Sequence, residues 1–196
     1  MVRALGSAVD CSTLVTPVDV APIRSPQRVH SVIARHVQGK RVVEIGTRNG
    51  DGMCCMSQVA SSAVAVELDA KYCDKLRARA DALNSTGAHS FTVVCEDYRK
   101  ARGLDADVFT WWQEPPHLGN PTVLTMLRGL QNDGQVRPDA EAILVFDEGW
   151  AEDMVDYAEL QRLGWMMWTE RVPNVNEFAE CRERLKRSMY RKHWCA

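Results

Sequence analysis

The stretch RVVEIGTRNGDG, residues 41–52, decides the fold because it joins a short apolar strand to a glycine-rich turn. The strand carries Glu44 near its end, and the turn contains Gly46, Gly50 and Gly52. Glycines at this place let the backbone approach a ligand, while the N-terminus of the next helix faces the same cleft. The spacing is not the dinucleotide-binding G-x-G-x-x-G, because Arg48 stands where a middle glycine is usual.

Strands and helices alternate outward from this turn. Apolar segments typical of buried strands lie at residues 63–69, 90–97, 106–112 and 142–150. Between the first two, a predicted helix over residues 70–85 gathers apolar side chains on one face, namely Cys73, Leu76, Ala80 and Leu83. The alternation predicts an α/β fold of three layers, in which helices cover both faces of a doubly wound, mostly parallel sheet.

The length of 196 residues and a hydrophobic content of 45% fit one globular domain. We expect residues 1–24 to form an irregular arm or lid and residues 25–196 to form the α/β domain. No apolar run approaches the ~18 residues that a membrane span needs, so no membrane partner is expected. The formal net charge of −2 gives no overall argument for nucleic acid, and we do not expect it as a partner.

The cysteines number seven and contain no C-x-x-C pair. Their odd count and their places inside apolar stretches support neither a zinc site nor a disulfide framework. We therefore expect reduced thiols and a cytoplasmic location.

Acidic residues stand at the tips of three successive predicted strands. Glu67 follows Gly46 by 67 − 46 = 21 positions, which suits a carboxylate that accepts hydrogen bonds from ribose hydroxyls. Asp97 ends the third strand, and Glu44 lies in the first. A cleft rimmed by these acids favours a cation. The alternative is that Glu44 and Asp97 cap helices or pair with the nearby Arg41 and Arg99.

Over roughly residues 27–170 the chain resembles the seven-stranded, Rossmann-like S-adenosylmethionine-dependent methyltransferases. The resemblance rests on five segments, VVEIGTRNG, AVELD, VVCEDY, ADVFTWW and AILVFD. It implies S-adenosyl-L-methionine as cofactor and direct displacement of its methyl group by an acceptor. Two departures are Arg48 in the loop and a C-terminus short for the usual final antiparallel hairpin, so we expect the last strands to be reduced or absent.

The resemblance also implies which residues hold the cofactor. The loop after the first strand would hold its methionine end, through Glu44, Gly46, Thr47, Arg48, Asn49 and Gly50. The ribose would lie against Glu67 and Leu68. The adenine amine would contact Asp97, with Tyr98 nearby.

The loops after the fourth and fifth strands, TWWQEPPHLGN and FDEGW, are the expected acceptor side. Trp112 offers a cation–π surface, and Glu114 and Asp147 can hold an amine or act as a base. These loops predict a small-molecule acceptor, an amine or another cation. The ligand spacing of a metal site is not visible, so no metal is predicted.

Three other functions stay open. The chain could methylate a protein or a nucleic acid, for which the basic run at residues 182–192 is the only hint. It could instead be a catalytically inactive cofactor-binding or interaction protein of the same fold. A nicotinamide-dependent oxidoreductase is disfavoured, because Glu44 would lie close to the phosphates of such a cofactor.

Overall fold

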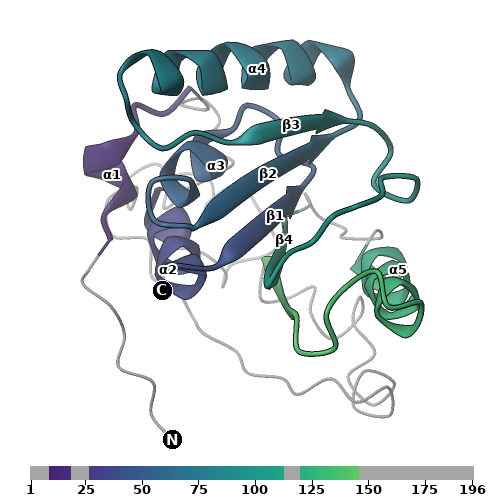
Figure 1. The fold of residues 1–196 in the computed structure, drawn as a ribbon. Helices are drawn as coiled ribbons and strands as arrows, with labels where there is room; N and C mark the ends of the chain where they lie inside the picture. Colours follow the sequence, from purple (N-terminus) through teal and green to yellow (C-terminus); the bar gives the residue numbers. More distant parts are fainter. Residues whose placement is uncertain (1–8, 19–26, 113–119, 146–196) are drawn as a thin grey trace, which may run out of the picture.

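The computed structural model of the protein describes residues 9–18, 27–112 and 120–145 (Figure 1). At its centre is a five-stranded sheet of β1 (Arg41–Ile45), β2 (Ser62–Glu67), β3 (Thr92–Cys95), β4 (Val108–Trp112) and β5 (Glu141–Val145). The strand order is β3-β2-β1-β4-β5, and every neighbouring pair is parallel. The direction of winding reverses between β1 and β4, which is where ligands bind in open α/β sheets.

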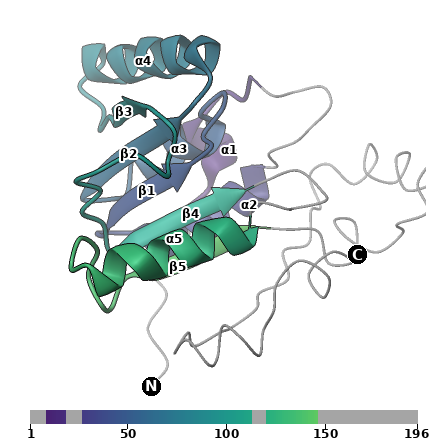
Figure 2. The same ribbon diagram turned by 90° about the vertical axis from the view of Figure 1, so that its right-hand side faces the viewer.

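Helices cover both faces of this sheet (Figure 2). One face carries α2 (Gln27–Val37), α3 (Asp51–Met56) and α4 (Ala70–Ser85), and the other carries α5 (Asn120–Asn132). Each face has its own cluster of buried apolar side chains. The predicted three-layer, doubly wound α/β fold is therefore confirmed.

Alternation along β1 explains how one strand serves both clusters. Val42 packs toward α2 and α3, whereas Val43 and Ile45 pack on the α5 side. A central strand buried on both faces has to be apolar along nearly its whole length. The helix that follows β2 begins with Asp69, whose carboxylate accepts a hydrogen bond from the backbone N–H of Lys71 at 2.8 Å.

The N-terminal segment that we expected to be irregular contains a short helix, α1 (Cys11–Leu14). Asp10 caps it by accepting a hydrogen bond from the backbone N–H of Ser12. Residues 9–18 also pack on the domain, because the backbone N–H of Val18 donates to the Asp51 carboxylate at 3.0 and 3.1 Å. The expectation is corrected for this segment, and residues 1–8 and 19–24 lie outside the described part.

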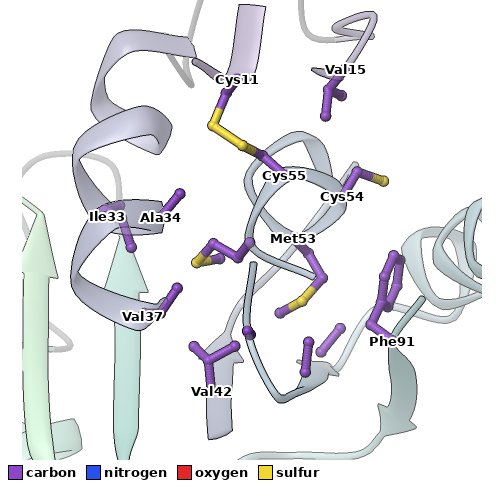
Figure 3. Close-up of a cluster of buried hydrophobic side chains, with 14 of the residues drawn as sticks. Cys11, Val15, Ile33, Ala34, Val37, Val42, Met53, Cys54, Cys55 and Phe91 are labelled. Atoms are coloured by element: carbon purple, nitrogen blue, oxygen red, sulfur yellow. A yellow bond between two sulfur atoms is a disulfide. The ribbon is translucent and has the colours of Figure 1, made fainter. Parts of the chain in front are cut away.

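Two disulfides correct the expectation of reduced thiols. Cys11 is bonded to Cys55 inside the buried cluster between α1, α2 and α3 (Figure 3), and Cys73 of α4 is bonded to Cys95 of β3. The partners are 44 and 22 positions apart in sequence. Local spacing could not reveal them, because each pairing depends on how two separate elements pack: α1 with α3 for the first disulfide, and α4 with β3 for the second. Cys54 is a buried free thiol.

Several predicted elements fall outside the described residues. They are the segments from residue 146 onward, including the last predicted strands and the basic run. Within the described part, no helix is long and apolar enough to cross a membrane.

Candidate functional site

The loop between β1 and α3 has the backbone of a glycine-rich loop although Arg48 replaces a glycine. Arg48 has φ of 55°, in the left-handed region that glycine adopts freely, and Gly46 and Gly50 have φ of 74° and 81°. A non-glycine residue pays about 1–2 kcal/mol for this conformation. The Arg48 backbone N–H donates to Glu67 Oε2 at 2.8 Å, so the strained residue faces the acid at the end of β2.

Glu67 is buried and binds backbone amides around it. Its Oε1 accepts hydrogen bonds from the N–H groups of Leu68 and Asp69 at 2.8 and 2.9 Å, and its Oε2 accepts the one from Arg48. A carboxylate has about four acceptor positions, so about one remains on Oε2. This position can accept a hydrogen bond from a ligand hydroxyl without disturbing the loop.

Leu68 is the most exposed of the large hydrophobic side chains in the described residues, at 69%. It follows Glu67 directly at the carboxyl edge of the sheet. Glu67 pairs with Cys95 in the parallel register between β2 and β3, and Asp97 comes two residues after Cys95. A buried acid, an exposed leucine and a second acid thus lie at one end of two adjacent strands.

Asp97 is held by a neighbour. Its carboxylate accepts hydrogen bonds from the Arg99 backbone N–H at 3.0 Å and from the Arg99 Nε at 2.9 Å, and these bonds lower the pKa of Asp97 to about 2. The alternative of pairing with Arg99 is therefore observed. The Arg99 side chain is 63% exposed, whereas the Asp97 side chain is 13% exposed. An adenine amine would have to share or replace one of these contacts.

Tyr98 connects this loop to β4. Its ring lies edge-on to the Trp111 ring, with centroids 5.2 Å apart and an interplanar angle of 70°. Trp111 is buried on the α5 side of the sheet. Trp111 is therefore a packing residue, whereas the side chain of Trp112 lies outside the described part.

Glu44 lies in β1 at the point where the strand order reverses. Its Oε2 is buried and has no hydrogen-bond partner among the described residues. Burial raises the pKa of Glu44 to about 8, the nearby Thr47 hydroxyl lowers it, and the charges of Glu67 and Asp51 raise it further. The Thr47 hydroxyl donates its hydrogen bond to the Glu44 carbonyl oxygen at 3.1 Å. The alternative of pairing with Arg41 is wrong, because Arg41 lies at the other end of the strand and binds Asp105 and Asp107 instead.

A second buried polar atom lies beside Glu44. Thr110 of β4 is opposite Glu44 in the parallel register, and its Oγ1 is also buried without a hydrogen-bond partner among the described residues. Buried polar groups are nearly always hydrogen-bonded, so two such oxygens on adjacent strands indicate a place for a polar ligand group or ordered water.

The start of α3 is tightly packed against Glu44. A Cβ on Gly52 would lie 3.0 Å from the His30 ring and 3.3 Å from Glu44 Oε1, so only glycine fits there without movement. Burial lowers the pKa of His30 to about 4, which keeps its imidazole neutral. The His30 ring behind Glu44 therefore supplies no positive charge to that carboxyl group.

The structure brings most of the predicted cofactor residues to one edge of the sheet. Thr47 and Asn49 are buried, and their side chains bond within the protein: Thr47 Oγ1 donates to the Glu44 carbonyl oxygen, and Asn49 Oδ1 accepts from Lys75 Nζ. The acceptor candidates Glu114 and Asp147 lie outside the described residues. No group of three metal-binding side chains occurs within the described part of the chain.

We did not predict several other residues of the site from the sequence. Thr110 could have been found by aligning β4 with β1, since parallel partners share a face. Tyr72, Lys75 and Arg79 of α4 touch the loop and recur at helical spacing. That recurrence was visible, but the same polar pattern is typical of a solvated helix face.

No protein-family model matches the sequence, and no curated protein sequence matches it. Solved structures do match. The precorrin-6y C5,15-methyltransferase from Geobacter metallireducens has a TM-score of 0.54 at 15% identity, over 81% of this chain and 81% of that chain. A candidate RNA methyltransferase from Pyrococcus horikoshii has a TM-score of 0.52 at 15% identity, over 85% and 86% of the two chains.

A dimethyladenosine transferase from Plasmodium falciparum has a TM-score of 0.50 at 20% identity, over 64% of this chain. The match spans only 42% of the length of that enzyme. At such identities the likeness shows the fold. The chain has the Rossmann-like fold of S-adenosylmethionine-dependent methyltransferases, as the sequence motifs predicted.

Proposed function

We propose that the protein is a methyltransferase that binds S-adenosyl-L-methionine along the carboxyl edge of β1, β2 and β3. The observation that carries this proposal is Leu68, which is 69% exposed beside the buried Glu67. An adenine ring covering Leu68 would remove apolar surface from water, and the ribose would take the remaining acceptor position on Glu67.

The other end of the site also fits this cofactor. When bound, S-adenosyl-L-methionine supplies an electrophilic methyl group on a cationic sulfur, next to an ammonium group. Glu44 has a buried oxygen without a partner among the described residues, and deprotonation would make it the counter-charge of a nearby cation. The residues of this chain would then align the methyl group with an acceptor, and alignment can account for about 7–11 kcal/mol of a barrier in the best models.

The test of the cofactor site is Glu67→Ala, with Glu96→Ala as the matched control. Glu96 is an exposed acid that follows Cys95, the register partner of Glu67 on the adjacent strand β3. A hydrogen bond to a charged group contributes about 1.5–3 kcal/mol, so Glu67→Ala should weaken S-adenosylhomocysteine binding by about ten-fold or more in calorimetry. Glu96→Ala should leave the affinity unchanged.

A second ligand separates direct contact from loop disturbance. Wild type should bind 5′-methylthioadenosine more tightly than its 2′,3′-dideoxy analogue, and Glu67→Ala should not distinguish them. Equal discrimination by wild type and variant would remove Glu67 from the ribose site. If neither nucleoside nor S-adenosylhomocysteine binds wild type while NAD does, the proposed cofactor is wrong.

For the acceptor we propose a small amine or other cation, held by Trp112, Glu114 and Asp147. The support is the residue content of the two loops that follow β4 and β5. The expectation that nucleic acid is no partner finds no support in the comparisons, because one structure of the same fold is a candidate RNA methyltransferase.

A cytoplasmic location also stays a proposal. The two disulfides weigh against a reducing compartment, where structural disulfides are rare.

A further inference from the structure

One face of α4 contacts the loop between β1 and α3 along its length. Side chains three or four positions apart share a helix face, and here the shared face is turned to the loop. Three loop residues and the first residue of α3 lie against it in order, with Arg48 beside Tyr72, Asn49 beside Lys75, Gly50 beside Leu76 and Asp51 beside Arg79. The helix therefore supports the loop along its length.

The contact between Arg48 and Tyr72 holds the residue that departs from the glycine pattern. The Arg48 guanidinium carbon is 5.5 Å from the centroid of the Tyr72 ring, and its Nη2 is 3.4 Å from the Tyr72 hydroxyl oxygen. The Lys75 ammonium lies 5.3 Å from the same centroid. Both cations are within the ~6 Å at which an aromatic ring attracts a cation.

Lys75 and Arg79 fix the next residues of the loop. Lys75 Nζ donates to Asn49 Oδ1 at 3.0 Å, and Arg79 Nη1 donates to the Asn49 carbonyl oxygen at 2.8 Å. A Cβ on Gly50 would lie 2.6 Å from Leu76 Cδ2, so any other residue at position 50 would clash with α4 unless the Leu76 side chain moved. The loop is thus packed against α4 at Arg48 and at the residues that follow it.

The backbone of Arg48 links the contact with α4 to Glu67 in the candidate ligand site. Its φ of 55° directs the N–H to Glu67 Oε2, at 2.8 Å. Arg48 would favour a right-handed or extended backbone if its side chain were released. The Arg48 amide would then leave Glu67, and Oε2 would lose the hydrogen bond that holds it, while Oε1 would keep its bonds to Leu68 and Asp69.

We propose that Tyr72 is a positioning residue for cofactor affinity, because its ring holds Arg48 in the left-handed conformation that glycine adopts without support. The proposal rests on the proposed function, since it assigns α4 a role in the same cofactor site. It also explains how a loop without its middle glycine keeps the glycine geometry.

The experiment is a cycle of Tyr72→Ala, Arg48→Gly and the double variant, with S-adenosylhomocysteine affinity measured by calorimetry. Tyr72→Ala should weaken binding by about five-fold, as expected when a left-handed non-glycine residue loses its anchor. In the Arg48→Gly background Tyr72→Ala should have no further effect, so the affinity of the double variant should match that of Arg48→Gly. An equal loss from Tyr72→Ala in both backgrounds would overturn the positioning role.

Two controls test whether the effect belongs to the ring. Tyr72→Phe keeps the ring and should retain wild-type affinity within about two-fold. Arg77→Ala removes an exposed cation of the same helix, which pairs with Asp74, and should change nothing. A loss with Arg77→Ala as large as with Tyr72→Ala would point to net charge or helix stability instead.

Hydrogen exchange at the amide of residue 48 tests the proposal in the absence of any cofactor. Exchange should be faster in Tyr72→Ala than in wild type, and equal in Arg48→Gly and the double variant. If wild type does not bind S-adenosylhomocysteine but exchange responds in this way, the proposed function is wrong and the positioning of the loop stands. If Tyr72→Ala leaves exchange unchanged, the positioning role is wrong whether or not the cofactor binds.

Discussion

Replacing Glu44 by glutamine should make the unfolding free energy less dependent on pH. Burial raises the pKa of Glu44 from 4.5 to about 8 in the folded protein, while in the unfolded chain the group ionises near 4.5. Between these values the folded state holds one proton more than the unfolded state. Stability therefore falls as pH rises through this window and levels off above about pH 8.

The size of the effect follows from the width of the window. It spans 8 − 4.5 = 3.5 pH units, and each unit is worth about 1.4 kcal/mol, so the limit is about 5 kcal/mol. Glu44→Gln has no proton to lose and avoids this loss. Its unfolding free energy relative to wild type should rise by a few kcal/mol, up to that limit, between about pH 4.5 and pH 9.

The comparison with wild type also removes the contribution of His30. Burial lowers the pKa of His30 to about 4, so its folded state holds fewer protons than the unfolded state between 4 and 6.5. Stability from this group rises with pH in that window, opposite to Glu44, and the difference between the two proteins cancels it.

The assay is urea unfolding followed by circular dichroism at about pH 5, 7 and 9, with Glu96→Gln as the control. Glu96 is exposed, so its variant should run parallel to wild type at all three values. If Glu44→Gln also runs parallel to wild type, Glu44 is ionised in the folded protein and its burial does not control its charge.

Two further predictions concern the disulfides and the acceptor side. Cys73→Ser should lower the unfolding free energy by about 3 kcal/mol and Cys11→Ser by about 4 kcal/mol, from loop closures over separations of 22 and 44, while Cys54→Ser should not show this loss. Two results together would contradict the disulfides. The wild-type protein would be equally stable with and without a thiol reductant, and all its cysteines would react with an alkylating reagent when it is unfolded. Trp112→Ala, Glu114→Gln and Asp147→Asn should depress methyl transfer while leaving S-adenosylhomocysteine affinity within about three-fold. A structure with that product bound and these side chains more than about 10 Å from its sulfur would refute the assignment.

The part of the fold from β1 to β3 could be predicted because the local apolar pattern of each element matches the face that it buries. The strand at β2 and the buried face of α4 were predicted from apolar spacing, and Cys73, Leu76 and Ala80 are indeed buried. The predicted third strand was longer than β3, because its last two residues, Glu96 and Asp97, leave the ladder and enter a turn.

The features that sequence could not give depend on contacts between distant segments. The pairing of Cys11 with Cys55 joins the N-terminal segment to α3, and no local pattern encodes it. Arg48 was recognised as standing in a glycine position, but its anchor on Tyr72 depends on how α4 packs against the loop. The charge state of Glu44 likewise depends on burial, which its place in the strand does not reveal.

The strand order also bears on how a lineage of such proteins can diversify. Every candidate cofactor residue, from Glu44 to Tyr98, belongs to the uninterrupted stretch that builds β1, β2 and β3 and the turns after them. The acceptor candidates all come from later segments, which join the first half of the sheet along the β1–β4 pair. Under the proposed function, sequence changes from Trp112 onward would alter which molecule receives the methyl group and would leave the proposed donor site intact.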